Sequence, residues 1–276
     1  MIFYYAIGGG LGHISRAISF LKSQNISNSD SIILATEQKQ FDLNINKNII
    51  YTNLESPILL RDLIENIIHQ YSISKIYIDT FPFGIKGEFI NLKTNIDKFL
   101  IARILKYDVY LNDISKSNLS IENPKTLFKC IYKIEKLNSD YESAISNFSN
   151  QFISLSLYDN QKFIESKENN IEPYYMIAHT GSLEELQVLM EHAKDYANQN
   201  SFKGKILIFS PNFIESDNFI SLKFQYGINE YYPQATLMFT GCGFNTMNEL
   251  RPFRKKHIRI PFKRRYDDQY LRNYFS

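Results

Sequence analysis

A histidine and an aspartate each lie at the expected carboxyl end of a strand, where catalytic groups are found in open parallel sheets. His13 follows a glycine-rich loop, residues 8–12, which comes after a β-type run at residues 2–7, and Asp79 ends a similar run at residues 75–79. Functional groups of such sheets lie outside the carboxyl ends of the strands. An imidazole titrates near neutrality, so His13 is suited to act as a general base. Asp79 would either orient this histidine or contact an acceptor hydroxyl. The structural alternatives are a core histidine and an aspartate that caps a turn.

A second glycine turn lies near the end of the chain. The apolar run 235–239 predicts a buried strand, and residues 240–250 then read Thr-Gly-Cys-Gly-Phe-Asn-Thr-Met-Asn-Glu-Leu. This order is typical of a strand, a tight turn and a helix, whose first N–H groups favour a phosphate. Asn245 and Thr246 either cap that helix or contact the ligand, and Glu249, which we expect on the first turn, is placed to bind a ribose. The alternative is an ordinary turn with an asparagine cap and a glutamate that complements the helix dipole.

Composition restricts the class of protein. With 276 residues, 44% of them hydrophobic, the chain is long enough for two modest domains or one large one. It has no run of about 18 apolar residues and no basic leader before the first strand, so we expect a cytoplasmic protein. The two cysteines predict free thiols. A net charge of +2 gives no argument for nucleic acid. Residues 251–265 are locally basic, which is typical of a solvated face, of diphosphate attraction or of an anionic membrane surface.

Strands, loops and helices alternate along both halves of the sequence. In the first half we expect strands at 2–7, 31–35, 48–52, 75–79, 99–105 and 151–157, and helices at 14–21, 59–71 and near 125–137. In the second half we expect strands at 174–178, 205–209, 219–224, 237–240 and 258–261, and a helix at 183–196. The polar stretch 162–172 is the candidate linker. The pattern predicts an α/β protein with two Rossmann-like domains, residues 1–168 and 169–276, that face a central cleft.

Three stretches together resemble the two-domain GT-B glycosyltransferases, most closely the MurG-like enzymes of glycosyltransferase family 28. Gly-Gly-Leu-Gly-His at 9–13 is similar to their N-terminal glycine loop, and residues 240–250 are similar to their donor-nucleotide motif. Ile-Pro at 260–261 with Asp-Gln-Tyr at 268–270 is similar to the segment that closes on the donor sugar. The resemblance spans nearly the whole chain. It implies an inverting transfer of a sugar from a UDP- or dTDP-sugar, bound mainly by the C-terminal domain, to an acceptor hydroxyl.

The resemblance also implies roles for individual residues. His13 matches the proposed base, Glu249 the carboxylate that holds the ribose, and Asp268 and Gln269 the pair that contacts the sugar. The remaining expected donor contacts are Gly10, Gly12, Thr180, Gly181, Ser182, Gly241, Gly243, Phe244, Asn245, Thr246 and Arg265. No cofactor and no metal are implied, because the nucleotide sugar is a co-substrate and helix N-termini, backbone amides and an arginine would stabilise the leaving diphosphate.

The chain departs from the family in three places. Asp268 stands where the peptidoglycan enzymes have glutamine, Arg-Lys-Lys-His at 254–257 replaces a Gly-Lys-Pro turn, and the sequence stops at Ser276, inside the helix expected after 268–270. We therefore expect a compact member with a shortened C-terminus.

Several alternatives stay open at this level. One is a nucleotide-sugar 2-epimerase of similar fold, and another is a catalytically inactive or partner-dependent subunit that only binds the nucleotide sugar. The acceptor, expected near the aromatic loop 81–84, is open among glycan, lipid-linked and small-molecule hydroxyls. A protein partner, a homo-oligomer and peripheral association with the inner face of the membrane are also open, and nucleic acid is not expected.

Overall fold

The computed structural model covers residues 1–276 in two compact units, each described here by itself. It describes residues 1–36, 48–53, 56–90, 92, 94–116, 127–157, 172–212, 214, 218–223 and 228–276. The expected linker and the expected domain boundary at 168 fall almost wholly outside these residues.

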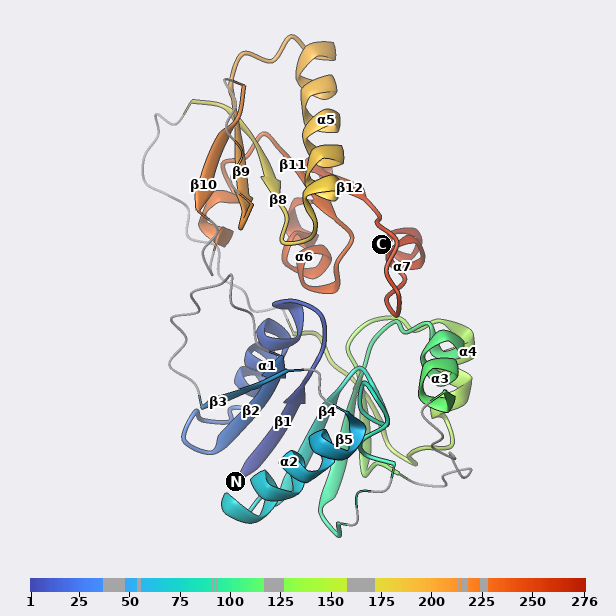
Figure 1. Ribbon diagram of the computed structural model, residues 1–276. Coiled ribbons are helices and arrows are strands. Elements are labelled where there is room, and N and C mark those ends of the chain that lie inside the picture. The colour runs from blue at the N-terminus through green and yellow to red at the C-terminus, as the bar shows by residue number, and fades with distance from the viewer. Residues whose placement is uncertain are drawn as a thin grey trace. The chain divides into compact units, whose positions relative to one another are not determined.

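The first unit is built on a seven-stranded parallel sheet with the order β3-β2-β1-β4-β5-β6-β7 (Figure 1). Its strands are β1 (Ile2–Ala6), β2 (Ser31–Thr36), β3 (Ile49–Thr52), β4 (Lys75–Asp79), β5 (Asp97–Ala102), β6 (Cys130–Lys133) and β7 (Phe152–Ser154). Its helices are α1 (Gly12–Ser23), α2 (Pro57–Gln70), α3 (Tyr107–Ser115) and α4 (Ser139–Ile145). The strand order reverses between β1 and β4, and ligands of such sheets bind outside the carboxyl ends of the strands at this point.

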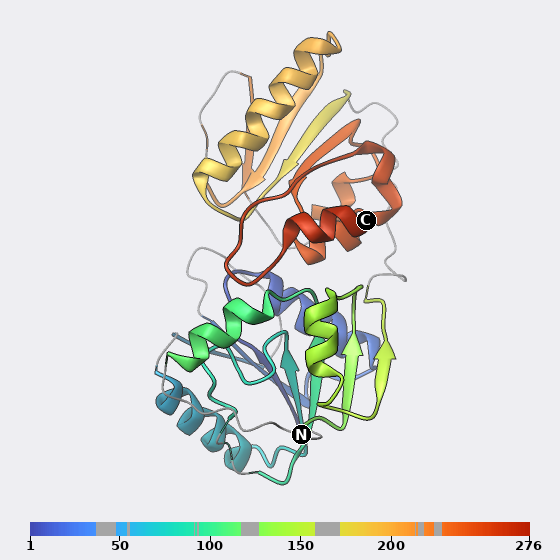
Figure 2. The ribbon, with the colours of Figure 1, turned by 90° about the vertical axis from the view of Figure 1, so that its right-hand side faces the viewer.

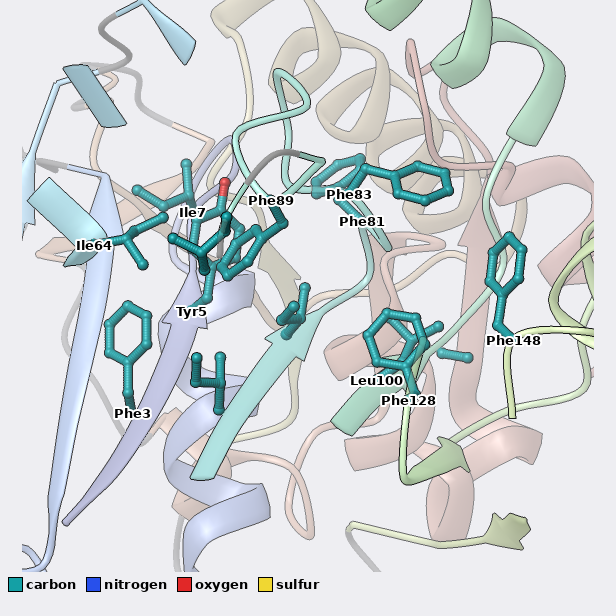
Figure 3. Close-up of a cluster of buried hydrophobic side chains, with 14 of the residues drawn as sticks. Phe3, Tyr5, Ile7, Ile64, Phe81, Phe83, Phe89, Leu100, Phe128 and Phe148 are labelled. Atoms are coloured by element: carbon teal, nitrogen blue, oxygen red, sulfur yellow. The ribbon is translucent and has the colours of Figure 1, made fainter. Parts of the chain in front are cut away.

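Alternating side chains of β1 fill the two faces of this sheet. Phe3 and Tyr5 belong to a core that also contains Leu60 and Ile64 of α2 and side chains of α3 and α4. Figure 3 shows part of this core, in which the Tyr5 and Phe89 rings meet edge to face with their centroids 5.0 Å apart. Tyr4 points to the opposite face, where its ring lies 5.7 Å from that of Phe20 of α1. Both faces are therefore covered, as a parallel sheet requires.

The second unit is a five-stranded parallel sheet with the order β10-β9-β8-β11-β12. Its strands are β8 (Tyr174–Ala178), β9 (Lys205–Ser210), β10 (Ile220–Lys223), β11 (Leu237–Gly241) and β12 (His257–Ile260). Its helical segments are α5 (Leu183–Gln199), α6 (Phe244–Glu249), two 3₁₀ segments at Ile228–Tyr231 and Arg251–Lys256, and α7 (Gln269–Phe275), which begins in the first unit. This order repeats that of the first sheet's initial strands, with its reversal between β8 and β11.

Helix α5 covers one face of the second sheet (Figures 1 and 2). Its buried residues Leu186, Leu189 and Ala193 recur at helical spacing and pack on Tyr175 and Ile177 of β8. Burying a leucine side chain contributes about 1.5–3 kcal/mol. The opposite face is covered by the 3₁₀ segment Ile228–Tyr231 and the residues around it. The two sheets thus share one construction.

A late segment of the chain, Arg264–Leu271, belongs to the first unit, whereas Arg272–Ser276 belongs to the second. The amide N–H of Lys106 donates to the carbonyl of Tyr266 at 2.7 Å, and the Tyr266 ring packs edge to face on Phe81 at 5.4 Å. Sequence reasoning placed residues 169–276 in one domain and did not predict this exchange. It depends on contacts between residues more than 150 positions apart.

Residues 106–150 also differ from the prediction. The helix expected near 125–137 is wrong, because Cys130–Lys133 form β6, paired with β5, and the helices of this region are α3 and α4 instead. A short apolar run is ambiguous between helix and strand, and pairing with an existing sheet edge decides between them. The remaining expected strands and helices are confirmed, with ends that differ by a few residues.

Cys130 and Cys242 are both buried, and neither forms a disulfide with any described residue. None of the helices in the described part of the chain is long and apolar enough to cross a membrane.

Candidate functional site

The first expected catalytic pair meets at the order reversal of the first sheet. Tyr5 of β1 pairs with Ile78 of β4, so the loop after β1 begins beside Asp79. The loop turns at Gly10, whose φ of +90° is a conformation that favours glycine, and α1 begins at Gly12. His13 is therefore directed toward the end of β4 from the first turn of α1.

His13 and Asp79 are in direct contact, which is the arrangement in which Asp79 would orient the imidazole. The His13 Nδ1 atom lies 2.5 Å from Asp79 Oδ2. Arg16, one helical turn after His13, donates from Nε to Asp79 Oδ1 at 2.8 Å and from Nη2 to Asp79 Oδ2 at 2.7 Å. All three side chains are buried, Asp79 completely. Because an ionised carboxylate only accepts hydrogen bonds, this contact favours the tautomer with the proton on Nδ1 and a lone pair on Nε2.

The charges around His13 set its protonation. Burial has the largest effect and lowers the pKa of His13 to about 4, with Asp79 opposing this change and Arg16 adding to it. Burial would raise the pKa of Asp79, but Arg16 and then His13 outweigh it and hold that pKa well below its ordinary value. At neutral pH the pair is thus a neutral imidazole on a carboxylate.

Two neighbours fix the imidazole ring. A Cβ atom added at Gly8 would overlap the ring, with Nε2 as the nearest atom, whereas one added at Gly9 would have no atom within 4 Å. On another side, the Phe81 ring is stacked at 6.0 Å from the His13 ring. Only glycine at position 8 leaves room for this position of His13. Phe81 and Phe83, at 2% and 4% exposed, are core residues, so packing accounts for the aromatic loop.

A second arginine connects this cluster to the late segment. Arg103, just after β5, donates from Nε to Thr80 Oγ1 at 2.9 Å and pairs through Nη1 with Asp267 Oδ1 at 2.6 Å. Thr80 itself has a φ of +70°, which is strained for a β-branched residue, and its carbonyl accepts from the Tyr141 hydroxyl at 3.1 Å. Such strain persists only where the surroundings enforce it, and it is typical of functional sites.

The corresponding loop of the second unit follows β8. Ser182 caps α5, since its side chain accepts from the amide N–H of Glu185, and Thr180 and Ser182 are exposed. His179 Nε2 lies 3.0 Å from Glu185 Oε2, and a Cβ atom at Gly181 would overlap both side chains. Gly181 is thus required by packing, while Thr180 and Ser182 are accessible to a ligand.

The glycine turn after β11 lies beside that loop, because Thr240 pairs with Ala178. Gly243 is the N-cap residue of α6 and makes no side-chain cap, so neither Asn245 nor Thr246 caps this helix. A Cβ atom at Gly243 would meet no atom within 4 Å, so the backbone there faces open space. Gly241 ends β11, and Phe244, the first residue of α6, is buried.

Glu249 differs from the prediction. It is the last residue of the six-residue helix α6 and does not lie on the first turn, because the helix begins only at Phe244. A carboxylate at this end opposes the helix dipole, so the dipole does not explain the residue. Burial raises the pKa of Glu249, an effect that the Tyr232 hydroxyl, donating to Oε2 at 3.2 Å, partly offsets.

The other expected donor contacts lie in the late segment. Arg265 donates two hydrogen bonds, each of 2.8 Å, to Asp113 of α3. Asp268 Oδ1 accepts the amide N–H of Leu271 at 3.0 Å and so caps α7, and Gln269 is buried. These side chains have local partners within the protein, and their contacts with a donor sugar stay a prediction.

Sequence reasoning missed Arg16, Thr80, Arg103 and His179. The signal for Arg16 was its position three residues after His13, which puts both on one helix face. Thr80, Arg103 and His179 each closely follow the end of a strand, β4, β5 and β8, at the functional edge of their sheet. In the described part of the chain, no group of three or more His, Cys, Asp or Glu side chains is placed to hold a metal ion.

Comparison with known proteins gives a similarity of fold. No protein-family model matches the sequence, and no curated protein matches it. Among solved structures, the spinosyn forosaminyltransferase SpnP is similar at 8% identity over 95% of this chain and 79% of its own, with a TM-score of 0.58. MurG of Acinetobacter baumannii is similar at 12% identity over 99% and 82% of the two chains, with a TM-score of 0.51. The UDP-GlcNAc 2-epimerase of Methanocaldococcus jannaschii is similar at 10% identity over 99% and 91%, with a TM-score of 0.53.

These similarities cover both sheets and include the enzyme group that the sequence motifs resemble. At such low identities, these similarities are evidence for the fold and not for the activity. With its two parallel Rossmann-like sheets, the chain has the GT-B fold of nucleotide-sugar glycosyltransferases.

Proposed function

We propose that the protein transfers a sugar from a nucleotide-diphosphate sugar, of the UDP or dTDP type, to an acceptor hydroxyl with inversion at the anomeric carbon. The observation that carries the proposal is the buried His13–Asp79 pair, with a separation of 2.5 Å, at the order reversal of the first sheet. A neutral imidazole held by a carboxylate is a general base that is ready at neutral pH.

The proton chemistry follows from the tautomer. His13 Nε2 accepts the proton of the acceptor hydroxyl while Nδ1–H stays on Asp79. The acceptor oxygen forms its bond to the anomeric carbon, and the bond from that carbon to the diphosphate oxygen breaks with its electron pair on the diphosphate. A single displacement of this kind inverts the configuration. Asp79 stabilises the imidazolium that forms, as carboxylates do beside catalytic histidines.

The donor side of the proposal uses the second unit. The open backbone at Gly243 and the exposed loop residues Thr180 and Ser182 lie at the carboxyl ends of the neighbouring strands β11 and β8. Ser182 opens the 17-residue helix α5, whose N-terminus attracts a diphosphate. Glu249 has a position that the helix dipole disfavours, and contact with ribose hydroxyls gives a reason for it.

The test combines binding with turnover. UDP and dTDP binding is measured by calorimetry, and consumption of a panel of UDP- and dTDP-sugars is measured with cell extract as the acceptor source. We expect His13→Ala to keep nucleotide affinity and to lose turnover by about 10²–10⁴-fold, the range for a general base. Glu249→Ala should lose nucleotide affinity. The exposed His69→Ala and Glu230→Ala are matched controls that should change neither quantity.

Other outcomes support the alternatives. Nucleotide binding without donor consumption in any extract indicates a binding-only subunit or one that needs a partner. Conversion of the donor to its 2-epimer, without acceptor, indicates an epimerase. If neither His13→Ala nor Glu249→Ala changes binding or turnover, the glycine turn at 240–250 is only a turn and the proposal fails.

A further inference from the structure

The contacts of Arg16 go beyond what a helix needs for packing. Arg16 is 2% exposed, and its guanidinium donates to both oxygens of Asp79, at 2.8 and 2.7 Å. This two-point contact is the strongest geometry available to a carboxylate. A hydrophobic residue would fill the same space without burying a charge, so the arginine serves the carboxylate.

We propose that Arg16 is a positioning residue that holds Asp79 as a carboxylate in one orientation and, by cancelling its charge, keeps His13 a neutral and only moderately strong base. This inference rests on the proposed function in one respect, that His13 takes the acceptor proton. Its electrostatic part concerns the free protein alone.

The hydrogen bonds of Asp79 support the first half of the proposal. Oδ1 accepts from Arg16 Nε, and Oδ2 accepts from Arg16 Nη2 and from His13 Nδ1. With both oxygens occupied by donors, the carboxylate neither rotates nor takes a proton from the imidazole. Nδ1 of His13 is therefore held as the donor, and Nε2 is the atom left to act as a base.

The charge balance supports the second half. In a histidine and aspartate pair alone, proton capture by the imidazole takes the site from one negative charge to neutral, which favours a strongly basic histidine. With Arg16 included, capture takes the site from neutral to one positive charge. The captured proton is then released more readily after transfer, which matters because the base must be regenerated in each cycle.

Among the described residues, Asp79 is the negative group that acts on the pKa of His13, and Arg16 and Arg103 are the positive groups. Arg16 contacts it from α1 and Asp79 from the end of β4, and the charge of Arg103, at the end of β5, also acts on it. The Phe81 ring is stacked over the imidazole. Arg103 is itself paired with Asp267. Arg16 is thus the cation in closest contact with the carboxylate that His13 uses.

The test is a titration of His13 by nitrogen-15 NMR in the full chain, without donor or acceptor. The chain has five histidines, so His13→Gln identifies the signals. We expect wild-type His13 to stay neutral, with Nδ1 protonated, at pH 6. In Arg16→Met the uncompensated Asp79 should raise the pKa of His13 by at least about 1, the size of the effect of a close carboxylate. Lys22→Met, an exposed cation removed from the same helix, should leave it unchanged.

Arg16→Lys separates charge from geometry. It should leave the pKa of His13 near the wild-type value, because the cation remains. The NMR signal of the Nδ1–H tautomer should weaken, because a single ammonium does not hold both carboxylate oxygens of Asp79. Once a donor is known, kinetics can be measured as well. Arg16→Met should shift the acid limb of the pH profile of kcat/KM to higher pH. It should also lower kcat by about 10–100-fold and leave the KM for the donor unchanged.

Three results would overturn the proposal: a folded Arg16→Met protein whose His13 titrates as in the wild type, an Nε2-protonated tautomer in the wild type, or failure of both Arg16 variants to fold. The last would make Arg16 a structural residue. If the titration shifts as expected and no donor is consumed, this inference stands and the proposed function fails.

Discussion

The order reversal of the first sheet and that of the second carry different chemistry on the same topology. Beside β1 and β4 the loops hold His13, Asp79 and Arg16 in buried contact, and a side chain at Gly8 would collide with the histidine. Beside β8 and β11 the ionisable pair is His179 with Glu185, and the backbone at Gly243 faces open space.

Under the proposed function, this difference would divide two tasks between two sheets of the same topology. Proton transfer requires groups held in one geometry and shielded from water, so the first unit fills its reversal with side chains. A large anionic ligand requires accessible N–H groups and room for the backbone to approach, so the second unit leaves its reversal open. The following predictions test this comparison, beginning with the largest expected effect.

Gly8→Ala should lower turnover by about 10²–10³-fold, because the new methyl group displaces the His13 imidazole and misplaced catalytic groups lose rate steeply. Gly9→Ala is the matched control, since its methyl group would meet no atom within 4 Å. Nucleotide affinity should be unchanged in both. The assay is kcat for donor consumption beside the Kd for UDP, and equal rates for the two variants would mean that the position of His13 is unimportant.

Burial keeps His13 of the first unit and His257 of the second neutral, and protonation of either histidine should destabilise its unit in acid. Burial lowers the pKa of His13 and of His257 to about 4. Between that value and the ordinary pKa near 6.5, the unfolded chain binds more protons, so the free energy of unfolding falls as pH falls through this window. The loss approaches about 3 kcal/mol for each residue, and Asp79 adds its own loss only below about pH 4.

Calorimetric melts at pH 7 and pH 4.5 measure this dependence. His257→Gln should reduce the difference between the two melts and leave turnover unchanged, because His257 Nε2 contacts Thr240 Oγ1, at 2.8 Å, and Thr240 is buried. His13→Gln should reduce the difference as well but abolish turnover. An acid dependence that neither variant reduces would contradict the assignment of these two groups.

Ser182→Asp should weaken UDP binding by about tenfold, or about 1.4 kcal/mol, because a carboxylate at the start of α5 repels a diphosphate. Stability should not change, since aspartate caps a helix as well as serine does. Ser56→Asp makes the same exchange at the cap of α2 in the first unit and should leave affinity unchanged. Equal affinities for both variants would show that Ser182 only caps its helix.

Ser201→Gly should stabilise the second unit by about 1 kcal/mol, because Ser201 follows α5 with a φ of +48°, where glycine has no steric penalty. Thr80 has a similar backbone strain, with a φ of +70°, yet Thr80→Gly should lose stability because Oγ1 accepts from Arg103. Thermal melts compare the two. A stabilising Thr80→Gly would mean that the strain in the first unit has no structural support.

Much of the architecture could be predicted because it depends on local sequence patterns. Most strands are short apolar runs bounded by turn residues, and α2 and α5 carry apolar residues at helical spacing. The exceptions are in residues 106–150, where β6 forms from a run that is ambiguous by itself. The two glycine loops were recognised because glycine has no Cβ atom. Directly before a histidine or a helix it allows a tight turn, and this property can be read from the sequence alone.

The sequence by itself determined the α/β class and the two successive sheets, and it identified His13 and Asp79 as candidates at one sheet edge, because strand ends of parallel sheets converge on one edge. Tertiary structure alone decided that Arg16 holds both oxygens of Asp79, that Arg103 joins Thr80 to Asp267, and that Arg264–Leu271 packs with the first unit. Arg16 and Asp79 are 63 positions apart, and Arg103 and Asp267 are 164 positions apart. Local propensity contains no information about such distances, since the partners are chosen by burial and charge only after the sheet has formed.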